Sequence, residues 1–240
     1  MTFSSNGGPP LRRVGHKGAD LIVPGNTLAS FDAAVDAGVD MIEFDVLPEE
    51  GTDRLILAHD YEDACRRRVL TFEQALDHLS NGRCAGIELD VDLKLPGYEQ
   101  RVVDALRERG LASRSLVCSQ FVESLDRLRE LAPELRLGWS VPKVRRDYTK
   151  SIVYKLPAYA LLRVLARALP YQATDAFAAR RCDAVMAHWR LVTPRLVDAV
   201  ANAGGELYVW TVDDAARIRA FAALGVTGVI SNDPRLFATT

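Results

Sequence analysis

Short apolar runs alternate along the chain with segments whose apolar residues recur at helical spacing. The clearest run, 41–47, reads Met-Ile-Glu-Phe-Asp-Val-Leu and is apolar apart from two carboxylates. Segment 28–37 shows the other pattern, with apolar residues three and four positions apart, as in an amphipathic helix. The same two patterns predict further strands at 11–16, 54–60, 84–93, 115–119, 135–141, 183–187, 206–212 and 228–231, and further helices at 72–79, 98–109, 122–131, 194–203 and 214–224.

Capping residues agree with several of these helix boundaries. Thr71 is followed three positions later by Gln74, the capping-box pattern expected at the start of a helix. Asn26 or Thr27 can cap the 28–37 helix, and Gly38 is placed to end it.

The alternation amounts to about eight strand–helix units in 240 residues, and most strands are continuous apolar runs, as expected when helices cover both faces. This pattern predicts a (β/α)8 TIM barrel that forms a single domain over 1–240. An open doubly wound sheet is the alternative. No G-x-G-x-x-G or P-loop motif is present, which argues against the nucleotide-binding version of that alternative.

Segment 143–170 departs from the alternation and is predicted to be an amphipathic basic insertion. Its only acidic residue is Asp147, and its basic residues are Lys143, Arg145, Arg146, Lys150, Lys155, Arg163 and Arg167. Two interpretations are open. The segment is the fifth barrel helix with a solvated basic face, or it is a lid or surface helix that makes peripheral contact with anionic lipid or an acidic partner.

The composition narrows the class of protein. A hydrophobic content of 48% and a charged content of 26% are ordinary for a globular protein, and a net charge of −2 argues against a nucleic-acid binder. The four cysteines are scattered, which favours reduced thiols and a cytoplasmic location. Neither a signal peptide nor a membrane span is expected from the apolar runs.

Polar residues cluster at the predicted strand ends, where a barrel of this class carries its chemistry. Glu43 and Asp45 lie two positions apart and share one face of their strand, because side chains alternate along a strand. If they are buried, two neighbouring carboxylates need a positive partner, usually a metal ion or a phosphate-binding Lys or Arg. The alternative is a half-exposed strand with a solvated acidic face, and the histidines nearby favour the metal. The other residues at strand ends are His16, Lys17, His59, Asp92, Lys94 and Trp210.

Oxygen ligands favour a hard cation, Mg²⁺ or Ca²⁺, and two histidines beside it suit acid–base work on a phosphate ester. Strict alternation places Glu88 and Asp90 on the face of Asp92, so either is an alternative ligand. His188 ends another strand, where a pocket role and plain packing are both open. His78 is interpreted as a surface or packing residue.

Four motifs in order resemble the N-terminal signature of the glycerophosphodiester phosphodiesterase family. They are Gly15-His16-Lys17-Gly18, Pro24-Gly25-Asn26-Thr27, Ile42-Glu43-Phe44-Asp45-Val46 and Ala58-His59-Asp60. Farther on, Asp92-Leu93-Lys94 is similar to the family's Glu-x-Lys, and the segments around Trp210 and 228–234 resemble its last strands. The resemblance covers 14–237.

The resemblance implies a (β/α)8 barrel that hydrolyses glycerophosphodiesters to glycerol 3-phosphate and an alcohol with Mg²⁺ or Ca²⁺, in glycerol and lipid metabolism. It also implies roles for individual residues. Glu43, Asp45 and Asp92 would bind the metal, His16 and His59 would be the acid–base pair, Lys17 and Lys94 would contact phosphate, and Trp210 would line the pocket.

The sequence departs from the family pattern at four positions. Lys17 replaces Arg and loses a bidentate phosphate contact. Gly25 replaces Glu, Asp92 replaces Glu, and Asn232 stands where the family often has Asp. Two alternative functions are therefore open: a lysophospholipase D-type phosphodiesterase that acts on lysophospholipids, suggested by 143–170, and a weakly catalytic barrel that binds a phosphorylated ligand or a lipid surface.

Overall fold

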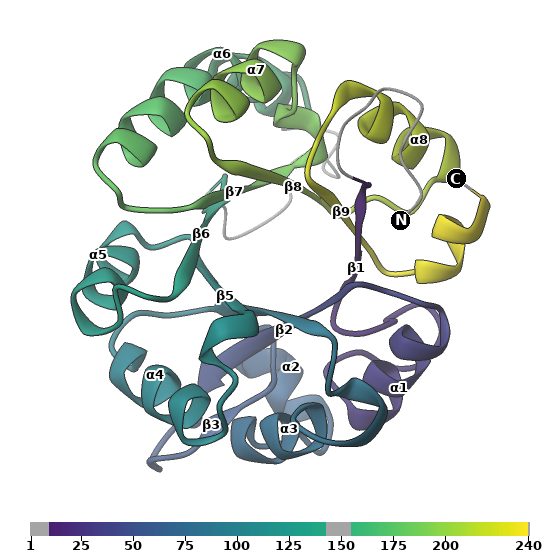
Figure 1. The fold of residues 1–240 in the computed structure, drawn as a ribbon, viewed down its shortest axis with the longest axis vertical. Helices are drawn as coiled ribbons and strands as arrows, with labels where there is room; N and C mark the ends of the chain where they lie inside the picture. Colours follow the sequence, from purple (N-terminus) through teal and green to yellow (C-terminus); the bar gives the residue numbers. More distant parts are fainter. Residues whose placement is uncertain (1–9, 143–154, 240) are drawn as a thin grey trace.

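The strands close into a barrel (Figure 1). The computed structural model describes residues 10–142 and 155–239, and over these it forms one sheet in the order β1-β9-β8-β7-β6-β5-β4-β2-β3. A further pairing of β1 with β2 closes the ring, and every neighbouring pair within the ring is parallel. The predicted (β/α)8 barrel is confirmed.

The barrel strands are β1 (Arg12–Gly15), β2 (Met41–Pro48), β4 (Glu88–Leu93), β5 (Ser115–Ser119), β6 (Arg136–Val141), β7 (Ala184–His188), β8 (Glu206–Trp210) and β9 (Gly228–Ser231). The helices are α1 (Leu28–Asp36), α2 (Tyr61–Arg66), α3 (Phe72–Leu79), α4 (Glu99–Glu108), α5 (Val122–Leu131), α6 (Lys155–Ala178), α7 (Pro194–Asn202) and α8 (Ala215–Leu224). Apart from the short α2, they surround the barrel as an outer layer (Figure 1).

The predicted strand at 54–60 is wrong in length and in role. Only β3 (Leu55–Ile56) forms there, and it pairs antiparallel with β2 as a hairpin outside the ring. The apolar residues Leu57 and Ala58, which follow β3, bury their side chains but belong to no β-strand. The Asp60 side chain then caps α2, a helix that the sequence pattern did not predict. The predicted strand at 84–93 is also shorter, because a 3-10 turn, η1 (Gly82–Cys84), precedes it.

The capping predictions are confirmed. Thr71 and Gln74 form a reciprocal capping box at the start of α3. Thr27 caps α1, with Ser30 as its partner, so of the two candidates Thr27 is the cap. Gly38 follows α1 with φ 76°, a conformation in which glycine is not strained.

The predicted insertion at 143–170 is only partly described, because 143–154 lies outside the described residues. From Lys155 onward the segment is the first part of α6, which connects β6 to β7 as an ordinary barrel helix. Leu169 and Ala173 are buried, whereas Arg163 and Arg167 are exposed. Of the two interpretations, the described part therefore supports the first: it is the fifth barrel helix with a solvated basic face. It is not an insertion between barrel elements.

A charged cluster occupies the amino-terminal end of the barrel. Glu88 at the start of β4 forms ion pairs with Arg12 and Arg136, and Arg136 Nη2 donates to Glu206 Oε2 at 2.6 Å. Glu88 is thus at the opposite end of β4 from Asp92. The suggestion that Glu88 substitutes for Asp92 as a metal ligand is wrong. The two residues share a face of β4, but Glu88 is its first residue and Asp92 lies near its carboxyl end, where the cavity is.

Replacing Glu88 by Ala should lower the free energy of unfolding by about 2 kcal/mol, since two partly buried guanidinium groups lose a charged hydrogen-bond partner. Turnover should stay near the wild-type value. Denaturant unfolding measures the change, and Glu62→Ala is the matched control because its pair with Arg66 is exposed. An equal loss in both variants would contradict the structural role of the cluster.

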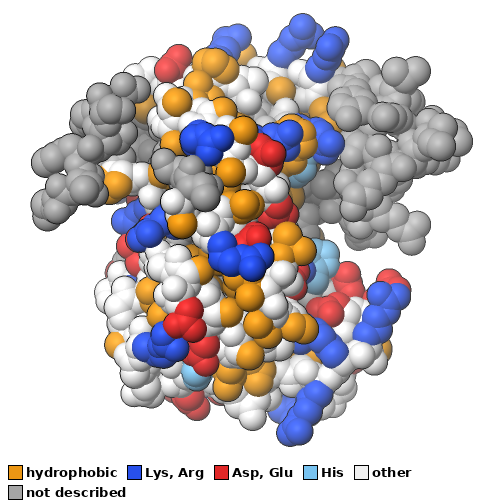
Figure 2. Space-filling view, turned by 90° about the vertical axis from the view of Figure 1, so that its right-hand side faces the viewer, with side chains coloured by type: hydrophobic (Ala, Val, Ile, Leu, Met, Phe, Trp, Pro, Cys, Tyr) orange, Lys and Arg blue, Asp and Glu red, His pale blue; other side chains and the backbone are white. Residues whose placement is uncertain are grey.

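The face that carries α1 and α8 shows acidic and basic side chains interspersed among white and apolar surface (Figure 2). Basic side chains do not gather into a single patch over its described part. Among residues 10–142 and 155–239, no helix combines the length and the apolar character needed to cross a bilayer.

Candidate active site

A cavity of about 510 Å³ opens at the carboxyl ends of the barrel strands. Its walls come from strands and loops far apart in the sequence. The polar residues that line it are His16, Lys17, Glu43, His59, Asp60, Tyr61, Asp90, Asp92, Lys94, Cys118, Gln120, Ser140 and Thr211, together with Trp210. All of the predicted site residues except the fully buried Asp45 are therefore cavity-lining residues.

Three carboxylates meet on the inner side of β2 and β4. The parallel register places Asp45 opposite Asp92 and Glu43 opposite Asp90. One carboxylate oxygen from each of Glu43, Asp45 and Asp92 lies within 4.8 Å of the other two. The adjacency of the two strands, which the sequence could only suggest, is what brings the three predicted ligands together.

Two loop residues hold these carboxylates in place. Asn26 is buried with φ 56°, its Nδ2 donates to Asp45 Oδ2 at 2.9 Å, and its Oδ1 accepts from the backbone N–H of Asp45 at 3.2 Å. The backbone N–H of Lys17 donates to Glu43 Oε2 at 2.7 Å. Sequence reasoning considered Asn26 only as a helix cap. Its place in the Asn-Thr motif was the available signal for a role at the site.

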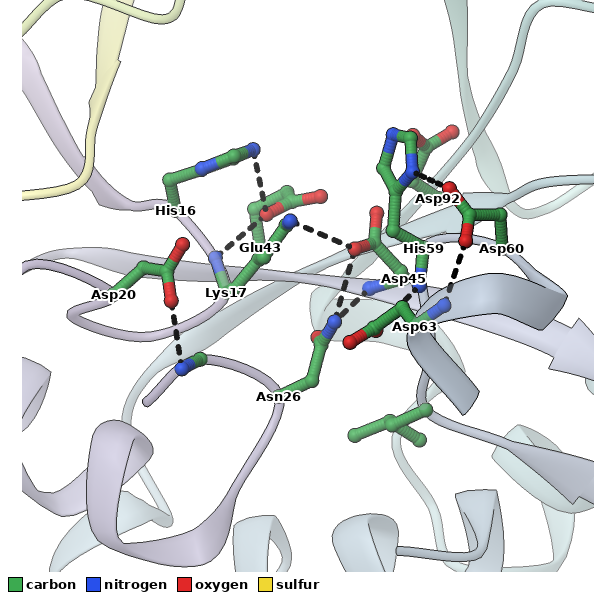
Figure 3. A network of polar contacts seen from close by, with 12 residues as sticks. His16, Lys17, Asp20, Asn26, Glu43, Asp45, His59, Asp60, Asp63 and Asp92 are labelled. Carbon is green, nitrogen blue, oxygen red and sulfur yellow. Dashed lines mark hydrogen bonds and ion pairs between the residues drawn. The ribbon is translucent and has the colours of Figure 1, made fainter. Parts of the chain in front are cut away.

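The two predicted phosphate-binding lysines pair with the carboxylates of the cluster. Lys94 forms ion pairs with Asp45 and Asp92. Lys17 Nζ lies 3.7 Å from Asp45 Oδ2 (Figure 3). Burial favours the neutral amine, but the adjacent Asp45 and Asp92 outweigh it and raise the pKa of Lys94 well above its ordinary value. Burial likewise opposes ionisation of Asp45, yet Lys94 and Lys17 hold the pKa of Asp45 below its usual range.

Glu43 and Asp90 are electrostatically different from Asp45. Burial and the charge of Asp45 raise the pKa of Glu43 to about 8. Burial and the neighbouring Glu43 raise the pKa of Asp90 well above its ordinary value. Asp90 is 1% exposed and is hydrogen-bonded to Cys118. It precedes Asp92 by two residues on the same face of β4, so it lies deeper in the barrel and belongs to the floor of the cavity.

The hydrogen bonds of His16 determine its tautomer. Asn232 Nδ2 donates to Asp213 Oδ2 at 2.7 Å, and because a carboxylate only accepts, this bond fixes which way the Asn232 amide faces. Asn232 Oδ1 therefore faces His16 Nδ1, 2.5 Å away, and must accept from it. The proton resides on Nδ1, and Nε2 carries the free lone pair 3.8 Å from Glu43 Oε2.

His59 lies across the carboxylates from His16 (Figure 3). Its Nδ1 donates to Asp60 Oδ2 at 3.0 Å, and its backbone N–H donates to Asp63 Oδ2 at 3.2 Å. The side chain of His59 is 54% exposed, whereas that of His16 is 22% exposed. The cavity thus holds one recessed and one rim imidazole, each with a carboxylate or amide on Nδ1.

Burial and the adjacent Lys17 lower the pKa of His16 below its ordinary value. Asn232→Asp would place a negative charge against Nδ1–H, favour the imidazolium and raise that pKa by about 1 unit or more. If neutral His16 is the active form, we expect the acidic limb of the kcat/KM profile to move to higher pH.

The pH dependence of kcat/KM measures this shift. Asn232→Ala is the control, since it removes the orienting bond without adding charge, and should lower kcat without moving the acidic limb upward. An acidic limb that stays in place in Asn232→Asp would contradict the assignment of Asn232 as the partner of His16.

Gly25 and Trp210 have close neighbours that explain why these residue types stand at their positions. A Cβ at Gly25 would lie 2.6 Å from Asp20 Oδ1 and 2.7 Å from Lys17 Cβ, so the Asp20 carboxylate occupies the space beside this glycine and accepts its N–H. Trp210 Nε1 donates to the carbonyl of Met186, and the ring contacts His188 edge to face. Both Trp210 and His188 thus contribute to the packing of the cavity wall.

The carboxylate cluster fits a hard divalent cation. The donor set is made of oxygens only, the buried Asn26 amide orients Asp45, and the backbone N–H of Lys17 orients Glu43. The second group of metal-capable side chains, Asp32, His78 and Cys84, lies outside the barrel.

Comparisons with known proteins place the chain among phosphodiesterases. The family model described as "Glycerophosphoryl diester phosphodiesterase family" matches residues 16–48 and 54–236. A glycerophosphodiester phosphodiesterase of Caldanaerobacter subterraneus subsp. tengcongensis is 24% identical, over 92% of this chain and 93% of its own.

Solved structures share the fold. A glycerophosphodiester phosphodiesterase of Agrobacterium tumefaciens has a TM-score of 0.71 at 21% identity, covering 96% of this chain and all of its own. An Oleispira antarctica phosphodiesterase in complex with the product sn-glycerol-3-phosphate has a TM-score of 0.69 at 18% identity, covering 96% of each chain.

Proposed function

Because this chain belongs to the glycerophosphoryl diester phosphodiesterase family and is a phosphoric diester hydrolase, we propose that it uses a divalent cation to cleave glycerophosphodiesters into glycerol 3-phosphate and an alcohol. The observation that carries the proposal is the pair of imidazoles on opposite sides of a three-carboxylate cluster in one cavity. The product complex of the Oleispira relative supports glycerol 3-phosphate as the product.

Glu43, Asp45 and Asp92 would hold the cation, Mg²⁺ or Ca²⁺. Such an ion supplies Lewis-acid stabilisation of the charge on the phosphoryl oxygens. Its binding would give the carboxylates a second counter-charge beside Lys94, and would free the Lys94 ammonium to contact phosphate with Lys17.

The histidines would move the protons. In the first step the 2-hydroxyl oxygen of the glycerol attacks phosphorus while one imidazole takes the hydroxyl proton. The P–O bond to the alcohol breaks, and the other imidazole protonates that oxygen. Water then opens the cyclic phosphate to glycerol 3-phosphate.

The different depths of the two imidazoles support an assignment. His16 is recessed, carries its proton on Nδ1 and has a free Nε2, as a base for the enclosed glycerol group requires. His59 stands at the rim, where a leaving alcohol can depart into solvent. We therefore assign His16 as the base and His59 as the acid.

Hydrolysis of glycerophosphocholine with Mg²⁺, with Ca²⁺ and with chelator tests the proposal. Release of glycerol 3-phosphate that needs metal and disappears in His16→Ala is the expected result. Full turnover in chelator would rule out the metal-dependent scheme.

A second candidate, hydrolysis of lysophospholipids with release of the head group, is supported by α6. Its side chains Leu161, Val164 and Tyr171 are 56%, 59% and 60% exposed, and Arg163 and Arg167 are exposed beside them. Exposed apolar residues with interspersed arginine are typical of a surface that meets anionic lipid. Good turnover of glycerophosphocholine without head-group release from lysophosphatidylcholine would exclude this candidate.

The alternative of a weakly catalytic binding barrel makes a separate prediction. A pure binder has no need of one imidazole poised as a base and another as an acid, so it would release no glycerol 3-phosphate at any pH. A pH–rate profile governed by two groups would reject it.

A further inference from the structure

Three side chains with different donor atoms meet on the outer helical layer, away from the cavity. Asp32 comes from α1, His78 from the last turn of α3 and Cys84 from η1. One ligand atom of each lies within 4.8 Å of the other two, and His78 Nε2 is 2.9 Å from Asp32 Oδ1. None of the three lines the cavity of the candidate active site.

The turn that carries Cys84 is anchored from the side. Arg114 Nη2 donates to the carbonyl of Leu79 at 2.6 Å, and Arg114 Nη1 donates to the carbonyl of Cys84 at 3.2 Å and also to that of Ile87. One guanidinium thus fixes the end of α3, next to His78, and the turn with Cys84 relative to each other. The three ligands are held by packed elements and do not depend on a free loop.

The three donor residues differ in exposure. Cys84 is 1% exposed, whereas the side chains of His78 and Asp32 are 28% and 38% exposed. Two of the three side chains are therefore in contact with solvent, and the cysteine is enclosed by protein.

A thiolate, an imidazole and a carboxylate together match a borderline divalent transition ion, and differ from the oxygen-only cluster of the active site. Zinc–ligand distances of about 2.0–2.3 Å place tetrahedral donor atoms roughly 3–4 Å apart. The 2.9 Å between His78 Nε2 and Asp32 Oδ1, and the 4.8 Å within which all three donor atoms lie, are compatible with that geometry after small side-chain shifts. We infer that Asp32, His78 and Cys84 form a second metal site, for Zn²⁺ or a similar ion, that links α1 to α3.

Such an ion would act on stability, because it binds the folded chain and joins two outer helices. The catalytic carboxylates are not involved, so the site is independent of the proposed function. Binding should raise Tm, while Cys84→Ser, His78→Gln and Asp32→Asn should lose that shift and keep phosphodiesterase turnover.

Titration of the reduced protein with Co²⁺ tests the inference, since cobalt bound to a thiolate gives a sulfur-to-cobalt charge-transfer absorption that oxygen ligands do not give. We expect this absorption to saturate by two equivalents, since the carboxylate cluster in the cavity also takes up Co²⁺ without a sulfur ligand, and to disappear on addition of Zn²⁺. It should be lost in Cys84→Ser, a change of similar size, and weakened in His78→Gln. Far-ultraviolet circular dichroism confirms that each variant is folded.

Two matched cysteine controls locate the sulfur. Cys65 is exposed, and Cys118 lies in the catalytic cavity beside Asp90, where cobalt bound at the active site could reach it. Cys65→Ser and Cys118→Ser should keep the absorption. Its absence from the wild type, its persistence in Cys84→Ser or its loss in Cys118→Ser would each overturn the inference.

Discussion

His59→Ala should lower kcat/KM for glycerophosphocholine by about 10²–10⁴-fold, the usual contribution of a general acid. Toward a glycerophosphodiester with a nitrophenolate leaving group, which departs without a proton, the same variant should lose far less. The reason is the position of His59 at the exposed rim, with Nδ1 bonded to Asp60. Steady-state kinetics with the two substrates, side by side, measures the difference.

His16→Ala is the matched comparison, because His16 is the recessed imidazole with its free Nε2 beside Glu43. Loss of the base should lower kcat/KM by about 10²–10⁴-fold with both substrates, whatever the leaving group. Rescue of His16→Ala and not of His59→Ala by nitrophenolate would reverse the two assignments. Equal losses in kcat/KM for both variants with both substrates would contradict the assignment of His16 as the base and His59 as the acid.

Asp45→Asn should lower kcat/KM by about 10³-fold and weaken Mg²⁺ or Ca²⁺ binding, because several kcal/mol of charge stabilisation would go with the ion. Asp45 is fully buried and is the shared partner of Lys94, Lys17 and Asn26. The change keeps the size of the side chain and removes its charge. Metal titration by calorimetry, followed by kinetics at saturating metal, separates lost binding from lost chemistry.

Asp90→Asn is the control for Asp45→Asn. Burial and the adjacent Glu43 raise the pKa of Asp90 well above its ordinary value and so disfavour its charged form, and Asp90 is not one of the three clustered carboxylates. Metal affinity should stay close to that of the wild type. If Asp90→Asn abolished metal binding as fully as Asp45→Asn, Asp90 would replace one of the three carboxylates as a ligand.

The sequence by itself was sufficient for the family and the barrel. Continuous apolar runs such as 41–47 can form a strand covered on both faces, and capping residues such as Thr71 and Thr27 begin helices through local hydrogen bonds. The ordered motifs carry the resemblance, which the family match over 16–48 and 54–236 confirms. These features depend on neighbours within a few residues, so they can be read from the chain.

The sequence pattern gave a wrong prediction where an apolar run is buried by tertiary packing and does not form a strand. The run at 54–60 predicted a strand, but only Leu55–Ile56 pairs and the following residues pack against the barrel, since burial alone does not require a ladder. The alternation of side chains along a strand put Glu88 on the same face as Asp92. The two nevertheless lie at opposite ends of the barrel, because Glu88 begins β4 and Asp92 lies near its carboxyl end.

Tertiary structure alone decided the electrostatics and the long-range partners. Asn232 reaches His16 across 216 positions, and Asn26 fixes Asp45 through a buried amide. Such contacts depend on barrel closure, which pairs β1 with both β2 and β9 and so brings the two ends of the chain to one cavity. The directions in which the pKa values of Glu43, Asp45 and Lys94 are shifted follow from burial and from the distances between these charged groups. Both are set by the folded molecule and cannot be read from any single segment of the sequence.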